Sequence, residues 1–137
     1  MNNCPLCAKD LENVIVDNQH ARILFVVENA YPILRVVAKK HVKEMTDLEV
    51  EERNALMQMV FACEVVLRQF LKADKINLAS LGNVVPHLHW HIIARFENDA
   101  HFPDSIWAKP RREPLMPKAA KVDRTALQCA LYKLLND

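Results

Sequence analysis

His87-Leu-His-Trp-His-Ile-Ile93 alternates histidines with apolar residues. Successive residues of a β-strand face opposite sides of a sheet, so a strand here places the three histidines on one face. Leu88, Trp90 and Ile92 then form an apolar opposite face. Imidazoles exchange protons, attack electrophiles and bind metals near neutral pH, so the row indicates a functional site. A polar face with incidental histidines and a plain three-histidine metal site are the alternatives.

A tight turn is expected just before this strand. Gly82 is the only glycine in 137 residues, where average usage of ~7% would supply roughly ten. Glycine is needed where φ is positive or where the backbone approaches a ligand. We expect Gly82 to aim backbone N–H groups at the site, where they suit a phosphate. An ordinary hairpin turn is the alternative.

Length and charge restrict the class of protein. The 137 residues are expected to form one domain with a buried core. The net charge of +1 argues against binding to nucleic acid or to an anionic membrane. The N-terminus lacks a signal-peptide pattern, and charges interrupt the longest apolar segment, 55–71. We therefore expect a cytoplasmic protein.

The four cysteines fall into two classes. Cys4 and Cys7 have the spacing of half a tetrahedral zinc site, which needs two further ligands. A redox pair or two isolated thiols are the alternatives, although a redox CxxC normally follows a strand. Cys63 and Cys129 lie on apolar faces of expected helices, and both are predicted to be buried hydrophobes.

The pattern of the remaining residues predicts an α+β fold. Strands are expected over 14–17, 21–27, 33–39, 76–81 and 87–96, with Tyr31-Pro32 as a break before the third. A long helix is expected from a capping box at Thr46–Glu49 to about Lys72, with one buried stripe. This order predicts an antiparallel five-stranded sheet with the helix packed on one face.

The last third of the chain differs from the rest in composition. Residues 102–117 contain four of the seven prolines and predict an irregular surface arm. Its Trp107 is expected to stack on a base, contact a partner subunit or pack the arm. A C-terminal helix is expected, with Leu127, Leu131, Leu134 and Leu135 on one side. We divide a single domain over 1–137 into a core of 1–102, an arm of 103–117 and a helix of 123–135.

The alternating histidines resemble the signature of the histidine triad (HIT) superfamily of nucleotide hydrolases and transferases, His-Φ-His-Φ-His-Φ-Φ, where Φ is hydrophobic. Gly82-Asn83 stands where that family usually has Gly-Gln, and the resemblance extends from about Lys9 to Phe102. It implies the HIT-like fold, a homodimer and a nucleotide substrate.

The central histidine is chemically the best placed nucleophile, because its neighbours on the same face can orient the substrate oxygens. In the HIT family the middle histidine attacks the α-phosphate and becomes nucleotidylated, and His89 holds that position. We expect His91 to stabilise the developing charge and Asn83 to donate a hydrogen bond to the phosphate or leaving group. The resemblance adds Asn77, so the phosphate-binding residues expected are Asn77, Gly82, Asn83, His89 and His91.

The resemblance also completes the metal half-site. Some bacterial HIT proteins, and the related galactose-1-phosphate uridylyltransferases, bind a structural zinc through an N-terminal CxxC and two histidines. One of those histidines precedes the long helix, and the other is the first of the triad. By that resemblance a structural zinc is expected on Cys4, Cys7, His41 and His87.

Two departures from the family pattern leave the leaving group open. Val84 replaces a serine that would contact the phosphate, and Asn83 is one methylene shorter than glutamine. The family run Gly-His-x-Leu-Val-x-Pro-Lys is Pro32-Ile-Leu-Arg-Val-Val-Ala-Lys39 here, without its glycine, histidine or proline.

The favoured function is a hydrolase or nucleotidyl transferase that acts on the α-phosphate of a purine nucleotide. The substrate would be an ester, a phosphoramidate or a dinucleoside polyphosphate. The alternative, which Val84 and the bulky Trp90 support, is a nucleotide- or zinc-binding module without turnover.

Overall fold

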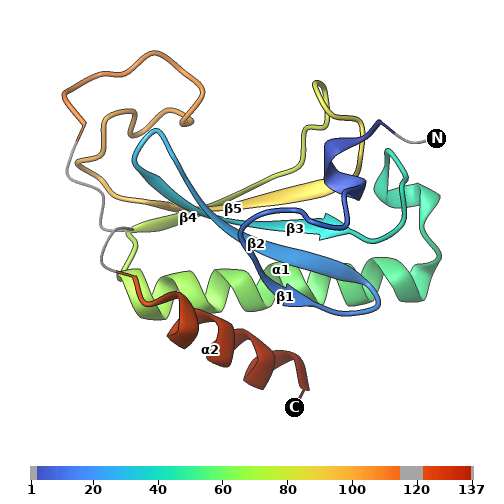
Figure 1. Cartoon of the computed structure of the whole chain (residues 1–137). Coiled ribbons are helices and arrows are strands. Elements are labelled where there is room, and N and C mark those ends of the chain that lie inside the picture. The colour runs from blue at the N-terminus through green and yellow to red at the C-terminus, as the bar shows by residue number, and fades with distance from the viewer. Residues whose placement is uncertain (1–2, 115–121, 137) are drawn as a thin grey trace.

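A computed structural model of the chain describes residues 3–114 and 122–136 (Figure 1). Its strands are β1 (Val14–Asp17), β2 (Ala21–Glu28), β3 (Tyr31–Ala38), β4 (Lys75–Ala79) and β5 (His89–Arg95). Its helices are α1 (Val50–Leu71) and α2 (Arg124–Asn136), with short 3-10 helices η1 (Pro5–Cys7) and η2 (Met45–Asp47). The end of the expected arm, 115–117, lies outside the described residues.

The five strands form one antiparallel sheet in the order β1-β2-β3-β5-β4. The last strand in the sequence, β5, is therefore inserted between β3 and β4. The helix α1 runs across one face of the sheet, and α2 lies beside it (Figure 1). The predicted α+β fold, a HIT-like antiparallel sheet with a long helix and a C-terminal helix, is confirmed.

Apolar side chains cover both faces of the sheet. The main core lies between the sheet and α1, and it includes Leu88 and Ile92 from the histidine segment. A smaller cluster lies on the opposite face. Its buried members are Tyr31, Ile33, Ile93 and Ile106. Because Ile106 belongs to the arm that follows β5, the arm covers part of the face that α1 leaves open.

The helix α1 begins three residues later than the capping box at Thr46–Glu49 predicted, because its N-cap is Glu49 and not Thr46. The Asp47 carboxylate accepts from the Glu44 backbone N–H at 3.1 Å, and this contact closes the separate turn η2. Glu52 then accepts from the Glu49 backbone N–H at 2.8 Å and caps α1 itself. The predicted buried stripe is otherwise present, apart from Phe70, which is partly exposed.

Three strand boundaries also differ from the prediction by two residues, and one of them is the end of β4 at Ala79. Tyr31-Pro32 does not break β3, because Pro32 lies at the end of β3 where only β2 is its partner, opposite Val27. The strand β5 begins at His89 rather than at His87, and Leu88 bonds instead to the Val42 carbonyl at 2.7 Å. His87 therefore precedes the strand.

The two helical cysteines have different environments. Cys63 is fully buried, and burial raises the pKa of its thiol, as expected of a small hydrophobe. Cys129 is exposed, so the prediction for it is wrong. The buried side of α2 is formed by Leu127 and Leu131, and a residue two positions after Leu127 points away from it. No helix in the described residues is long and apolar enough to span a membrane.

Candidate active site and metal centre

The structure divides the three histidines between two neighbouring sites. His89 and His91 lie on the face of β5 that is turned away from α1, with ring centroids 5.0 Å apart and ring planes at 75°. The ring of His87 instead meets the N-terminal segment, within 3.4 Å of the Cys4 and Cys7 sulfurs. One peptide segment thus supplies both a histidine pair and a member of a possible metal group.

The tautomer of His89 follows from one contact. Its Nδ1 lies 2.6 Å from the backbone carbonyl of His87. A carbonyl only accepts, so Nδ1 carries the proton and donates it. Nε2 is then left with a lone pair, which is the form that nucleophilic attack requires. The orientation of this ring is therefore set by the peptide that also positions the metal group.

His91 is buried from solvent and uncharged at neutral pH. It is 8% exposed, and the ring of Trp107 packs edge-on against it at 5.5 Å between centroids. Its Nδ1 is buried without a hydrogen-bond partner among the described residues. Burial, the neighbouring His89 and the Arg35 charge together lower the pKa of His91 to about 4. At neutral pH His91 is therefore an uncharged donor or acceptor.

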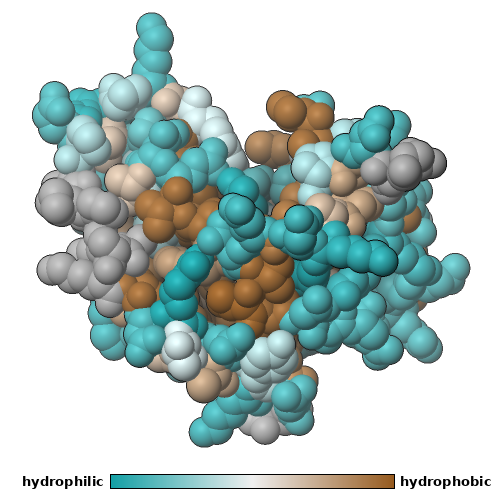
Figure 2. Space-filling model, viewed as in Figure 1, coloured by the Kyte–Doolittle hydropathy of each residue, from teal (hydrophilic) through white to brown (hydrophobic). Residues whose placement is uncertain are grey.

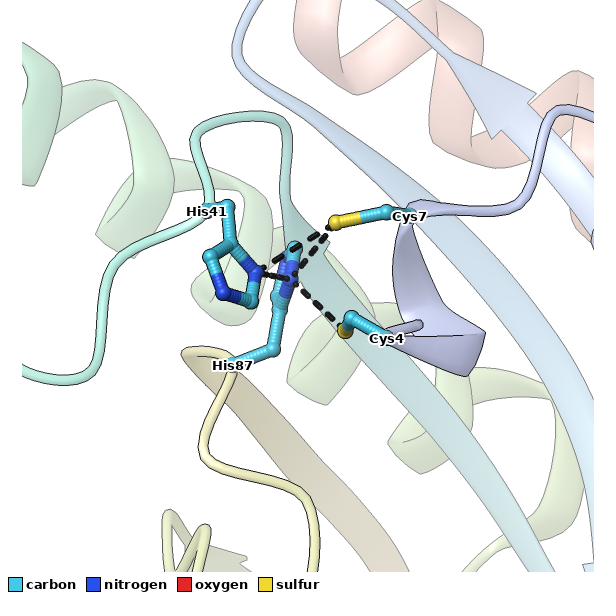
Figure 3. A group of neighbouring side chains, drawn as sticks. All are labelled: Cys4, Cys7, His41 and His87. Carbon is cyan, nitrogen blue, oxygen red and sulfur yellow. Dashed lines mark hydrogen bonds between the residues drawn. The ribbon is translucent and has the colours of Figure 1, made fainter. Parts of the chain in front are cut away.

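Cys4, Cys7, His41 and His87 form a compact group of potential metal ligands (Figure 3). Their ligand atoms all lie within 4.8 Å of one another. The His87 Nδ1 lies 3.4 Å from each sulfur and 3.0 Å from the His41 Nδ1. A tetrahedral zinc with bonds of about 2.0–2.3 Å separates its ligand atoms by about 3.3–3.8 Å. The two His87–sulfur distances lie in this range and the distance between the two Nδ1 atoms is slightly shorter, so the two cysteines and two imidazoles fit a metal ion.

Hydrogen bonds around the group fix the tautomer of His87 and the position of the CxxC segment. The His87 Nε2 donates to the Ala38 carbonyl at 2.7 Å, which leaves Nδ1 unprotonated and facing the sulfurs. Burial lowers the pKa of His87, which favours the neutral imidazole that a metal requires. The Arg22 guanidinium donates to the Leu6 and Ala8 carbonyls at 2.6 and 2.7 Å. Arg22 thereby ties the CxxC segment to β2.

The residues expected around the phosphate are not all brought together. Gly82 has the positive φ of 70° that was expected of it. Asn83 and Val84 are exposed in the loop before β5, and the Asn83 side chain makes no hydrogen bond to any described residue. Asn77 lies on the histidine face, and its Oδ1 accepts from Arg95 at 2.7 Å. The contribution of Asn77, Gly82 and Asn83 to phosphate binding stays a prediction.

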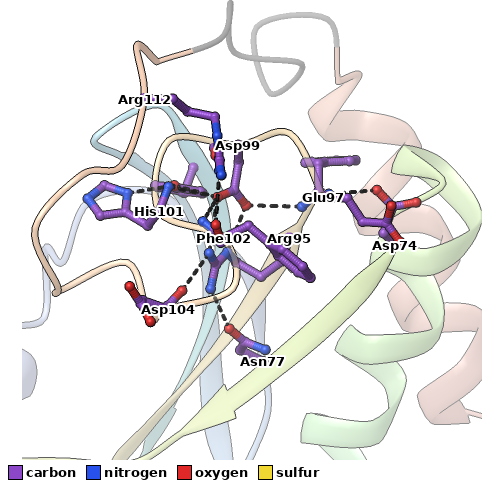
Figure 4. Close-up of polar contacts among 11 residues, drawn as sticks. Asp74, Asn77, Arg95, Glu97, Asp99, His101, Phe102, Asp104 and Arg112 are labelled. Atoms are coloured by element: carbon purple, nitrogen blue, oxygen red, sulfur yellow. Dashed lines mark hydrogen bonds and ion pairs between the residues drawn. The ribbon is translucent and has the colours of Figure 1, made fainter.

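A buried polar network behind the site was not predicted (Figure 4). Arg95 is 2% exposed and donates to both carboxylate oxygens of Asp99 at 2.8 and 3.0 Å. Asp99 also accepts from the Tyr31 hydroxyl, and Arg95 also donates to the Asp104 carbonyl. The only sign of this network in the sequence was an arginine, Arg95, at the end of an apolar strand, with an aspartate, Asp99, four residues later.

A family model of the HIT domain matches residues 9–98. The chain belongs to the HIT family. A histidine triad protein from Bradyrhizobium japonicum is 32% identical over 89% of both chains, with a TM-score of 0.71. A histidine triad protein from Marinobacter aquaeolei is 25% identical over 90% of this chain and 88% of its own, with a TM-score of 0.69.

A Zn-bound histidine triad family protein from Mycobacterium smegmatis shares the fold of this HIT protein. It is 21% identical over 96% of this chain and 95% of its own, with a TM-score of 0.60. A search of curated proteins gives no match. The HIT membership confirms a nucleotide-binding protein family, and the Cys₂His₂ group confirms that the chain can hold a metal.

Proposed function

We propose that this HIT protein is a hydrolase or nucleotidyl transferase that acts on the α-phosphate of a purine nucleotide conjugate. The observation that carries the proposal is the hydrogen bond from the His89 Nδ1 to the His87 carbonyl. It holds the ring in one tautomer and leaves Nε2 with the lone pair that attacks phosphorus. A pure binding site does not need that fixed tautomer.

The proposed reaction has two steps. The His89 Nε2 attacks the α-phosphorus, a P–N bond forms, and the bond from phosphorus to the leaving group breaks. The leaving group departs with the bonding electrons and is protonated from water. Water then attacks the nucleotidyl-histidine and releases the nucleoside monophosphate, or another acceptor replaces water in a transfer. His91 is neutral, so it would stabilise a phosphoryl oxygen by hydrogen bonding rather than by charge.

We further propose that the metal is zinc and that its role is structural. All four ligands come from the chain, which closes a tetrahedral site and leaves no position for substrate. The Mycobacterium smegmatis relative is Zn-bound, and Cys4, Cys7, His41 and His87 would hold the ion in this chain. Such a clamp would join the N-terminal segment to the peptide that orients His89.

A binding module without turnover remains the second candidate, because Asn83 and Val84 place no hydroxyl or bonded amide at the histidine pair. A fluorogenic adenosine phosphoramidate separates the two candidates. The enzyme proposed here releases AMP and the fluorophore over repeated turnovers. A module that binds the conjugate without releasing AMP would contradict the proposal.

A further inference from the structure

We propose that Arg35 binds the phosphate of the substrate alongside His91, as an anion-binding residue of this site. The inference rests on the proposed function and names a second group that recognises the same phosphate. The chemical class that it selects is an anionic phosphate ester or amide, and it disfavours an uncharged nucleoside.

The sheet register places Arg35 beside the histidine pair. Arg35 on β3 is directly opposite His91 on β5. Directly opposed residues of an antiparallel pair share a face, with Cβ atoms about 4.5–5.5 Å apart. The positive charge of Arg35 contributes, after burial and His89, to the lowered pKa of His91, which agrees with their closeness. The guanidinium therefore lies within reach of whatever group meets His91.

Both side chains carry a nitrogen without a partner. The Arg35 Nε and the His91 Nδ1 are the two buried side-chain polar atoms that lack a hydrogen bond among the described residues. Leaving a buried polar group unpaired is costly, and more so when it is charged. Two such atoms on opposed residues of one face mark a place where a polar ligand would supply the missing contacts.

The fixed contacts of Arg35 leave most of its donors available. Its Nη2 pairs with the Glu28 carboxylate at 2.5 Å, and its side chain is 26% exposed. A guanidinium has five N–H donors in a planar fork that matches two phosphate oxygens. The Glu28 pair therefore does not use up the binding capacity of Arg35.

The open part of this face lies between two projecting segments. The arm after β5 and the loop before β5 rise on the side of the sheet away from α1 (Figure 1). Figure 2, in the same view, shows the surface hollowed between them. A phosphate held at the histidine pair would enter from this side.

Arg35 would replace a phosphate contact that the family pattern provides and this chain lacks. It occupies the fourth position of the run 32–39, where the HIT pattern has leucine. The serine that would contact the phosphate is replaced by Val84, whose side chain is 93% exposed. A guanidinium beside His91 would supply the hydrogen bonds and charge that this hydroxyl does not.

The test compares AMP with adenosine by calorimetric titration of wild type, Arg35→Leu and Arg35→Gln. Hydrogen bonds to charged groups are worth about 1.5–3 kcal/mol, so either variant should bind AMP about tenfold or more weakly. Adenosine, which lacks the phosphate, should keep its affinity within about threefold. Equal losses for both ligands, or wild-type affinity for AMP in Arg35→Gln, would overturn the inference.

Glu28→Gln is the matched control, because it breaks the same ion pair and leaves the guanidinium in place. It should bind AMP as tightly as wild type or more tightly, since a competing carboxylate is gone. If Glu28→Gln weakens AMP as much as Arg35→Gln does, the pair is structural and the inference fails. Wild type that binds no AMP would instead refute the proposed function itself, so the two failures are distinguishable.

Discussion

At the scale of single residues, one carbonyl group links the two halves of the site. The His87 side chain belongs to the Cys₂His₂ group, while its backbone carbonyl accepts from the His89 ring. A shift of about an ångström in catalytic geometry can reduce a rate by about 10²-fold. The position of His87 is therefore important to His89 even though the two imidazoles have different tasks.

We expect His89→Ala to abolish turnover and to leave AMP affinity within a few fold. Binding is spread over many contacts, whereas the covalent step depends on one nitrogen. Steady-state kinetics with the phosphoramidate and titration with AMP give the two quantities. His20→Ala is the control, because His20 lies in the turn before β2 and belongs neither to the histidine pair nor to the metal group. A variant that retained more than about a tenth of kcat, a loss under ~1.4 kcal/mol, would show that His89 is not the nucleophile.

A second residue-scale prediction concerns the metal. Cys4→Ser should lose zinc, melt at a lower temperature and have a lower kcat, all together, because the clamp positions His89 and touches no substrate. Cys129→Ser removes an exposed thiol on α2 and should change none of the three. Elemental analysis, melting curves and kinetics on the same preparations measure them. Wild type purified without chelator that held well under one metal per chain would rule the clamp out.

At the scale of elements, the arm after β5 is held by its polar network. Asp99 accepts from Arg95 and from the backbone N–H groups of Phe96, His101 and Phe102. Burial alone would raise the pKa of Asp99, but these donors outweigh it and lower that pKa below its ordinary value. The arm that this network anchors also carries Trp107, whose ring packs on His91.

We expect Asp99→Asn to destabilise the fold by about 3–5 kcal/mol at pH 7, since it leaves the Arg95 charge buried and unpaired. The folded pKa of Asp99 is depressed, so its stabilisation is complete above the unfolded pKa of about 3.9 and is lost as pH falls below that. The difference in melting temperature between wild type and Asp99→Asn should therefore stay constant above about pH 5 and narrow as the pH falls from about 4 to about 2.

Asp104→Asn is the control on the same arm. Its carboxylate pairs with Arg111 at 2.7 Å, and both side chains are about half exposed. Solvent screens exposed ion pairs and they contribute little to stability, so this variant should melt close to wild type at neutral pH. If Asp99→Asn also melted like wild type, the network would not anchor the arm.

At the scale of the whole molecule, one edge strand of the sheet is bonded to a helix and the other has no neighbouring strand. Side chains of α2 bond to β1: Tyr132 accepts from the Asp17 backbone N–H at 3.2 Å, and Gln128 donates to the Ile15 carbonyl at 2.9 Å. The other edge, β4, has no strand beyond it in the described sheet. An open edge is a surface on which another strand can pair.

We propose that two copies of the chain pair through β4, which carries partly exposed Leu78, with Leu81 exposed just beyond it. Light scattering should give roughly twice the chain mass of 15.8 kDa. Leu78→Glu should reduce the mass to that of one chain, because it buries a charge at the contact. Leu134→Glu, at an exposed leucine of α2, should leave it unchanged. A monomeric wild type at micromolar concentrations would contradict the dimer.

The sequence by itself determined the features that depend on local periodicity. Alternation of histidines with apolar residues predicted that His87, His89 and His91 share a strand face, which holds for His89 and His91 but not for His87, because His87 precedes β5. The patterns of strand and helix predicted the α+β fold. The family pattern added the four metal ligands. The predictions of the shared face and of the fold succeeded because the period of a strand or a helix depends only on neighbouring residues.

Only the tertiary structure decided which distant residues meet. Inserting β5 between β3 and β4 places Arg35 opposite His91, and it brings His87 to Cys4, which is 83 residues away in the chain. It also lets the arm lay Trp107 on His91. The strand start at His89 and the network of Arg95 follow from the same packing. No local period encodes them, because each depends on contacts between segments whose order in the sheet differs from their order in the chain.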